Sequence, residues 1–92
     1  MISIEWLPRA ALNRFKQLDY IAQDNPLAAI GQDKEIERQV NMLMQHPEIG
    51  RSGRRPGTRE LVISRTSFIL VYRIKSNLKG IEILRLLHSS QQ

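Results

Sequence analysis

The residue type that offers most chemistry in this chain is arginine, and four arginines fall within nine residues. Arg51, Arg54 and Arg55 lie in a segment, residues 47–58, that holds three glycines and two prolines, and Arg59 follows it directly. Guanidinium groups form paired hydrogen bonds with phosphates and carboxylates. The segment lacks the lysine that a P-loop requires, so arginine side chains and flexible backbone amides would hold the anion. The pattern predicts a surface for an anionic partner, which is either a nucleic acid or an acidic protein segment.

Further cations lie in segments that we predict to be strands. Arg73, Lys75 and Arg85 are expected to share one face of a sheet with the arginines of the loop. Arg85 interrupts an otherwise apolar run at residues 81–87, and an isolated charge at a sheet edge would explain it equally well. These residues extend the predicted contact surface beyond the loop.

The two histidines are the remaining candidates for chemistry. His88 ends a predicted strand, where it could act as a general acid or base near neutral pH or simply bond to a neighbour at the surface. His46 precedes Pro47 at the predicted end of a helix, where interaction with the helix dipole accounts for it. Neither histidine has a carboxylate or cysteine at ligand spacing. We therefore expect no metal site and no cofactor.

Length and composition limit the class of protein. The 92 residues, of which 41% are apolar, suit a single domain spanning 1–92. The chain has no cysteine, no apolar run near the ~20 residues of a membrane span, and no signal-like N-terminus. We expect a cytoplasmic protein without a membrane partner. Residues 1–46 hold five basic and six acidic side chains, whereas residues 47–92 hold nine basic and three acidic ones.

The first half of the chain shows helical periodicity after a short strand. Residues 2–6 alternate in polarity and predict a strand. Pro8 suits the first turn of a helix, whose apolar stripe would comprise Ala11, Phe15, Leu18 and Ala22. Asn25 and Pro26 predict an N-cap and the start of a second helix reaching about residue 45. The short connection predicts an antiparallel helix hairpin.

The second half shows the two-residue period of strands. Glycine and proline exclude regular structure from residues 47–58, and strands follow at 61–63, 68–74 and 81–87. The result is an α+β fold of order β-α-α-β-β-β, with the helix hairpin on one face of a mostly antiparallel sheet. We expect some of Phe68, Ile69, Leu84 and Leu86 on the opposite face. The predicted core comprises Trp6, Phe15, Leu18, Ile36, Val40, Leu43, Leu61, Ile63, Leu70, Tyr72 and Ile83.

A series of short motifs extends over nearly the whole chain. Each motif is weak by itself, but their order and spacing together are specific. The motifs are Trp6 before the first helix, Tyr20-Ile21-Ala22, Asn25-Pro26, Leu43 before His46-Pro47, Gly50-Arg51, Gly57-Thr58-Arg59-Glu60-Leu61, Val71-Tyr72-Arg73 and Ile83-Leu84-Arg85-Leu86-Leu87-His88-Ser89. In this order they resemble the RelE/ParE superfamily of type II toxin–antitoxin toxins.

The resemblance implies a bacterial or archaeal toxin that a cognate antitoxin protein neutralises. The superfamily has two branches. ParE-like members poison DNA gyrase and are not known to catalyse a reaction, whereas RelE-like members cleave mRNA on the ribosome without a metal ion. The target is therefore gyrase in the first branch, and the ribosome with its mRNA in the second.

The residues at matched positions favour the ParE-like branch. Ile69 stands where several ribonuclease members carry an arginine on the scissile phosphate, and Ser89 stands where one subgroup has a tyrosine. His88 matches a catalytic histidine of some ribonucleases, so it would be catalytic only under the RelE-like alternative. In that alternative Arg59 or Arg65 would hold the phosphate, although neither matches cleanly. We assign no catalytic residue, and activity as an enzyme is the less favoured interpretation.

A third interpretation is a nucleic-acid-binding module that is not a toxin. It would explain the basic loop. Such modules usually carry stacking aromatic residues or a basic recognition helix, and the second predicted helix is neutral to acidic. The predicted target-contact or phosphate-binding residues are Arg51, Arg54, Arg55, Arg59, Arg65, Arg73 and Arg85.

Overall fold

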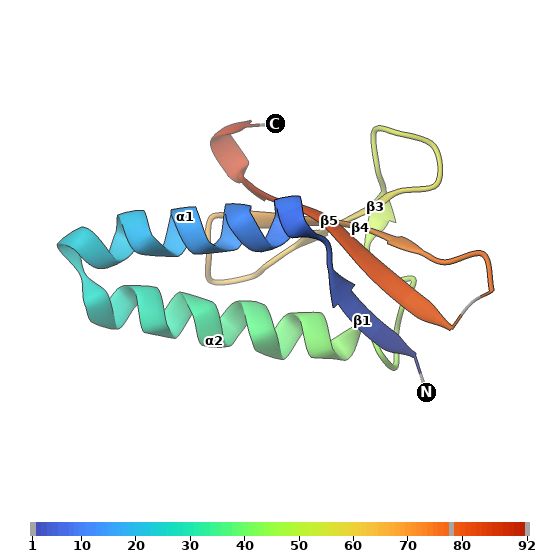
Figure 1. Ribbon diagram of the computed structural model, residues 1–92, viewed down its shortest axis with the longest axis horizontal. Coiled ribbons are helices and arrows are strands. Elements are labelled where there is room, and N and C mark those ends of the chain that lie inside the picture. The colour runs from blue at the N-terminus through green and yellow to red at the C-terminus, as the bar shows by residue number, and fades with distance from the viewer. Residues whose placement is uncertain (1, 78, 92) are drawn as a thin grey trace.

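The computed structural model describes residues 2–77 and 79–91, and it confirms the α+β fold of two helices on a mostly antiparallel sheet. The elements are β1 (Ser3–Trp6), α1 (Pro8–Asp24), α2 (Pro26–Met42), β2 (Arg51–Ser52), β3 (Arg59–Val62), β4 (Phe68–Ile74), β5 (Gly80–His88) and a final 3-10 turn (Ser89–Gln91). The five strands follow the spatial order β1-β5-β4-β3-β2, and the α1–α2 hairpin packs against them (Figure 1). Leu78, between the strands predicted at 68–74 and 81–87, lies outside the described residues.

Strand β1 lies at the edge of the sheet and pairs with β5 in parallel, from Ser3 opposite Gly80 to Trp6 opposite Ile83. Beyond the end of β1, helix α1 lies along the same edge of β5 and hydrogen-bonds to it. The Leu7 amide donates to the Ile83 carbonyl at 3.0 Å, and the Gln17 side chain donates to the Leu86 carbonyl at 2.6 Å. Asn13 Oδ1 accepts from the Leu86 amide at 3.2 Å. Two polar side chains of α1 therefore satisfy the backbone of β5 where β1 ends.

The predicted helix starts are confirmed, and the end of the second helix is corrected. Pro8 and Pro26 occupy the first turns of their helices, and Asn25 Oδ1 accepts from the Ala28 amide at 3.1 Å. Helix α2 ends at Met42 rather than near residue 45. The chain continues in tight turns instead, because the amides of Leu43, Met44 and Gln45 bond three residues back, as in a 3-10 helix, and not four.

The core confirms most of the predicted residues and corrects one. Ile36, Val40, Leu43, Ile63, Leu70, Tyr72 and Ile83 are buried together, and Trp6, Leu18 and Leu61 pack against them at its margin. Phe15 is 67% exposed, so its predicted place in the core was wrong. The inward face of α1 instead carries Ala10 together with Asn13 and Gln17. Polar residues share the inward face with Ala10, so the predicted apolar stripe was only partly right: Leu18 packs at the core margin, whereas Phe15 faces outward.

An irregularity in the pairing of β4 with β5 decides which side chains reach the core. Val71 lies opposite Arg85, but Tyr72 lies opposite Ile83, so Leu84 is an extra residue on β5. Such a bulge reverses the alternation of the faces. Leu86 consequently joins Phe68 in the core, while Leu84 lies on the opposite face of the sheet.

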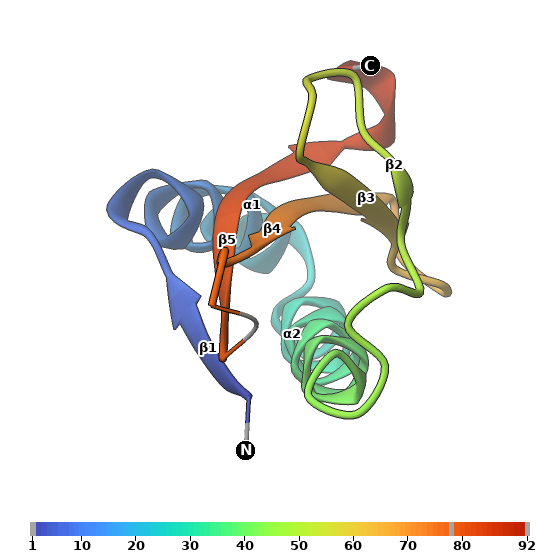
Figure 2. The ribbon, with the colours of Figure 1, turned by 90° about the vertical axis from the view of Figure 1, so that its right-hand side faces the viewer.

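The segment at residues 47–58 contains regular structure that we had excluded. Arg51 pairs with Glu60 and Ser52 with Arg59, which makes β2 an antiparallel edge strand of two residues. The glycines and prolines lie on either side of these two residues, so they interrupt the strand without preventing its pairing. Figure 2 shows the loop between β2 and β3 projecting from the sheet on the side away from α2.

Candidate functional site

Five arginines surround a cavity of about 380 Å³ on the face of the sheet that the core does not use. Because side chains alternate along β4, Val71 and Arg73 face away from Tyr72 and the core. Val71, Leu84 and Leu87 form an aliphatic floor, and Thr58 and Glu60 complete the lining. We call this site the arginine cavity, and its arginines are Arg9, Arg54, Arg55, Arg73 and Arg85.

The loop between β2 and β3 holds two of these arginines at its tip. Its ends are tied by a hydrogen bond of 2.8 Å from the Gly53 amide to the Thr58 carbonyl. The Thr58 hydroxyl also donates to the Arg55 carbonyl at 2.7 Å, and Gly57 takes a φ of +80°, which favours glycine. A side chain at Gly53 would collide with Thr58. The loop is therefore a fixed turn that presents Arg54 and Arg55, both exposed, to the solvent.

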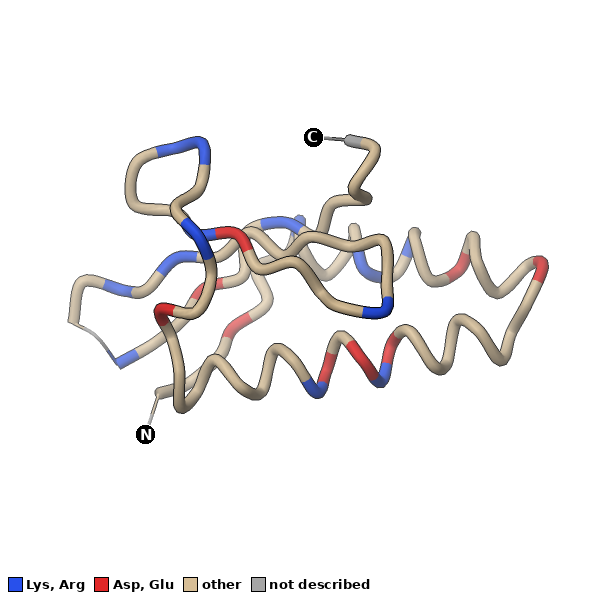
Figure 3. The backbone as a smooth tube through the Cα atoms, turned by 180° about the vertical axis from the view of Figure 1, so that it is seen from behind, with Lys and Arg blue, Asp and Glu red and all other residues tan. Residues whose placement is uncertain are grey.

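The arginine cavity carries a large excess of positive charge. Arg9, Arg54 and Arg55 have no ion-pair partner among residues 2–77 and 79–91. Arg85 Nε donates to the neutral Asn13 amide oxygen at 2.9 Å, and Arg73 Nε pairs with Glu82 at 2.7 Å. Figure 3 shows basic positions at the tip of this loop and along the sheet, and acidic positions lie among the basic ones both in the sheet and in α2.

The other predicted arginines have different surroundings. Arg51 pairs with Glu60, the one carboxylate that lines the arginine cavity, at 3.2 Å. Arg59 donates to the carbonyls of Gly50 at 2.8 Å and Glu48 at 3.2 Å, and so fixes the chain ahead of β2. Lys75, which we expected beside these arginines, lies 3.8 Å from Glu5 of β1.

The buried Tyr72 also fixes the segment of chain ahead of β2, through its hydroxyl group. Its hydroxyl accepts from the Gly50 amide at 2.9 Å and donates to the Pro47 carbonyl at 2.8 Å. Burial raises the pKa of this hydroxyl, although the hydrogen bond from Gly50 opposes the shift. Gly50 cannot carry a side chain here, since a Cβ would lie 2.7 Å from the hydroxyl oxygen. Tyr72 and Arg59 together fix the backbone that leads into β2.

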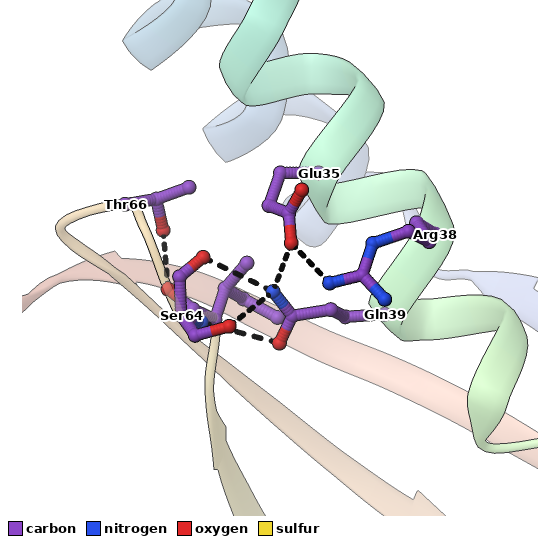
Figure 4. A network of polar contacts seen from close by, with 6 residues as sticks. Glu35, Arg38, Gln39, Ser64 and Thr66 are labelled. Atoms are coloured by element: carbon purple, nitrogen blue, oxygen red, sulfur yellow. Dashed lines mark hydrogen bonds and ion pairs between the residues drawn. The ribbon is translucent and has the colours of Figure 1, made fainter.

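Arg65 lies in the turn between β3 and β4, outside the arginine cavity, and has a positive φ of 66°. The side chain of Gln39 in α2 holds this turn by hydrogen bonds to Ser64, which Figure 4 shows. The Thr66 hydroxyl closes the turn by donating to the Ile63 carbonyl at 2.8 Å. Glu35 accepts from both Arg38 and Gln39, and the Arg38 bond lowers the pKa of that carboxyl while raising the pKa of Arg38.

His88 lies apart from the arginine cavity. It lines a second cavity of about 350 Å³ together with Lys16, Gln17, Tyr20, Ile21, Gln32, Ser67 and Phe68. Its ring meets Phe68 edge to face with centroids 6.2 Å apart, and its Nδ1 lies 2.8 Å from the Ser90 hydroxyl. The two cavities share no lining residue.

The arrangement can bind anions more readily than it can transform them. The cavity offers guanidinium donors and one carboxylate that already has a partner. In the described part of the chain no three His, Cys, Asp or Glu side chains are grouped to hold a metal ion. Neither α1 nor α2, nor any other helix among the described residues, is long and apolar enough to span a membrane.

Sequence reasoning missed Arg9, which is separated from the other lining residues by more than forty positions. It reaches the cavity only because α1 starts directly after β1 and runs along the edge of β5. The placement of Arg54, Arg55, Arg73 and Arg85 on one surface agrees with the expected sharing of a sheet face.

The fold and its basic cavity have counterparts among known proteins. Residues 4–92 match the family profile described as the ParE toxin of the type II toxin–antitoxin system parDE. The chain therefore belongs to the ParE toxin family, and with it to the RelE/ParE superfamily.

Individual relatives agree with this assignment. A protein of Sinorhizobium fredii named "Putative toxin Y4kP" is 39% identical over 90 residues, which cover 97% of this chain and 90% of the relative. The chromosomal ParDE system of P. aeruginosa contains a chain that superimposes with a TM-score of 0.84 and 31% identity, covering 96% of both chains. The toxin–antitoxin complex RelBE2 of Mycobacterium tuberculosis shares the fold, with a TM-score of 0.63 and 22% identity over 95% of this chain and 96% of the other.

Proposed function

We propose that this protein inhibits bacterial growth by binding DNA gyrase through the arginine cavity, and that a cognate antitoxin protein neutralises it. The observation that carries the proposal is the gathering of five arginines on one face of the sheet, apart from His88. An anion-binding surface without an adjacent acid–base pair suits an inhibitor that binds its target. Membership of the ParE family supports the same target.

The RelE-like alternative, cleavage of mRNA on the ribosome, is less well supported. Metal-independent cleavage of RNA needs a base, an acid and cations around one phosphate. Among the described residues that line the cavity of His88, Lys16 is the basic side chain, while five arginines line the separate arginine cavity. A general nucleic-acid-binding module is also less well supported, because α2 carries Asp33, Glu35 and Glu37 rather than a basic recognition surface.

The helix hairpin supports an antitoxin partner. Leu12, Phe15, Leu27 and Ile30 are between 50% and 80% exposed, which is unusual for large apolar side chains on one helix pair. Phe15 and Ile30 also line an open groove between α1 and α2. A disordered antitoxin segment that folds on binding could bury this surface and place acidic residues against the basic half of the chain. One antitoxin chain would then cover both the apolar side chains of the helix hairpin and the basic half of the toxin.

Two experiments test the proposal. Expression in a bacterial host should stop growth with filamentous cells, and co-expression of the protein encoded beside it should restore growth. Purified protein should inhibit supercoiling by purified gyrase, and the double variant Arg54→Ala, Arg55→Ala should inhibit less. The matched control Lys34→Ala removes an exposed cation from α2 and should inhibit like the parent. Codon-dependent cleavage of mRNA on purified ribosomes, with no effect on gyrase, would overturn the proposal.

A further inference from the structure

The arginine cavity includes two residues, Arg9 of α1 and Arg85 of β5, that reach it from the side opposite the loop between β2 and β3. We propose that this cavity binds the phosphate backbone of double-stranded DNA, so that the toxin contacts the DNA held by its target and not the target protein alone. The inference rests on the proposed function, and it specifies the partner of the same site.

The charge of the cavity calls for a ligand with several negative charges. Five guanidinium groups line one cavity. Arg73 is paired with Glu82, and the one carboxylate among the described lining residues, Glu60, pairs with Arg51 outside the ring of five. Arg9, Arg54 and Arg55 have no ion-pair partner in the described part of the chain. Like charges placed this close repel one another unless an anion lies between them. A polyanion satisfies several of these groups at once and releases counterions on binding.

The shape and lining of the cavity favour a duplex over unpaired bases. Its floor consists of Val71, Leu84 and Leu87, and no aromatic ring is present on which a base could stack. The arginines come from α1, β4, β5 and the fixed loop, so their spacing is held by secondary structure. The projecting loop, visible in Figure 2, carries Arg54 and Arg55 at its tip, where exposed arginines can reach phosphates along a groove. Recognition of this kind is independent of base sequence.

An acidic peptide is the competing ligand, since carboxylates also bind arginine. The aliphatic floor could accept an apolar side chain of such a peptide. The duplex is favoured because Arg54 and Arg55 come from the loop before β3 and Arg9 and Arg85 from α1 and β5, on the other side of β4, as expected for contacts with successive phosphates.

Binding is measured with the full chain, freed from antitoxin, by fluorescence anisotropy with a labelled duplex of about 20 base pairs over about 50–200 mM salt. Three to five phosphate contacts predict a slope of log K against log salt of about −3 to −5. Arg9→Gln and Arg85→Gln should each reduce the slope by about one and weaken binding to all sequences equally. Lys34→Gln, which removes the same charge from α2, should leave the slope unchanged.

Several results would overturn the inference. The first is equal DNA binding by Arg9→Gln, Lys34→Gln and the parent protein. The second is tighter binding of poly-glutamate or single-stranded DNA than of the duplex. Arg85→Gln also loses the bond to Asn13, so circular dichroism and antitoxin binding must show that it is folded, and Arg9→Gln tests the same point without that contact.

The inference and the proposed function can fail separately. Gyrase inhibition that depends on Arg54 and Arg55, by a parent protein that does not bind the duplex, would refute the DNA contact and leave the proposed function standing. DNA binding through the arginine cavity with no effect on gyrase would refute the proposed target and leave the DNA contact standing.

Discussion

Gln39 and Ser64 bond to each other in both directions across the gap between α2 and the turn that joins β3 to β4. Gln39 Oε1 accepts from the Ser64 amide at 3.1 Å, and Gln39 Nε2 donates to the Ser64 carbonyl at 3.0 Å. Nε2 also donates to Glu35 at 2.8 Å, and it lies 2.9 Å from the Ser64 hydroxyl, which shares the N–H directed at the Ser64 carbonyl. Gln39 is the buried polar side chain of α2, and both of its N–H groups and its amide oxygen have partners (Figure 4).

Replacing Gln39 should therefore destabilise the fold. Gln39→Leu keeps the volume but leaves the Ser64 amide and carbonyl without their partners, at a cost of about 1–3 kcal/mol in the free energy of unfolding. Urea denaturation should show a lower midpoint with an unchanged slope. Arg38→Ala, which breaks the exposed ion pair with Glu35, should lower the midpoint less than Gln39→Leu does. Equal losses in the two variants would contradict the assigned role of Gln39.

Tyr72→Phe should destabilise the protein through the loss of a hydroxyl that bonds to Gly50 and Pro47. The Gly50 amide and the Pro47 carbonyl would lose a buried partner, for which about 1–3 kcal/mol is expected. Burial raises the pKa of the Tyr72 hydroxyl, so folding favours its protonated form. Its contribution to stability is complete below the ordinary tyrosine pKa of about 10 and is lost as the pH rises through the higher folded value.

The pH dependence separates this effect from a simple packing defect. Denaturation midpoints measured between about pH 8 and pH 11 should fall for the parent protein and fall less for Tyr72→Phe. Tyr20, which is 73% exposed on α1, provides the control, and Tyr20→Phe should follow the parent curve. If the denaturation midpoints of all three proteins fell in parallel, the loss of stability at high pH would not come from Tyr72.

Gly31→Ala should stabilise the protein. A Cβ at Gly31 would meet no atom within 4 Å, and the residue lies inside α2 with ordinary helical backbone, so close packing does not require this glycine. Alanine in the interior of a helix is favoured over glycine by about 1 kcal/mol. Thermal denaturation should show a higher midpoint, with growth inhibition unchanged. A lower midpoint would mean that the glycine has a role in the helix that the packing does not reveal.

Phe15→Ser should weaken antitoxin binding and leave the isolated toxin stable. Phe15 is 67% exposed, and serine and phenylalanine have similar helix propensities, so the unfolding midpoint should hardly move. Burial of a phenylalanine against a partner contributes about 1.5–3 kcal/mol, which predicts a 10- to 100-fold weaker affinity. Val62→Ser, at a position 54% exposed on β3, is the control. Calorimetric titration with the antitoxin would reject the hairpin as a contact surface if both variants bound alike.

His88→Ala should leave toxicity largely intact. Loss of a catalytic acid typically lowers a rate 10²- to 10⁴-fold, whereas a residue outside the contact surface should change the inhibitory dose little. The variant loses the contact of the ring with Phe68, so its fold is checked by circular dichroism and antitoxin binding. A folded variant that binds antitoxin but neither stops growth nor supports mRNA cleavage would favour the ribonuclease alternative over gyrase.

Local sequence determined the elements of this protein and the loop that carries its charge. Pro8, Asn25 and Pro26 fix the starts of the two helices through backbone constraints that act within a few residues. The apolar run at β4 predicted a central strand at its observed bounds, Phe68–Ile74. Arg54 and Arg55 were predicted as surface residues because glycine and proline surround them.

Tertiary structure alone decided where these elements meet. The place of β1 beside β5 depends on pairing between residues more than seventy positions apart, which no local period encodes. That pairing sets α1 along the edge of β5, where Asn13 and Gln17 face inward and Phe15 faces outward, against the apolar pattern. It also brings Arg9 to the other arginines. The basic loop could thus be recognised in the sequence. The cavity could not, because it forms only when α1 lies along β5 and hydrogen-bonds to the backbone groups at the edge of that strand.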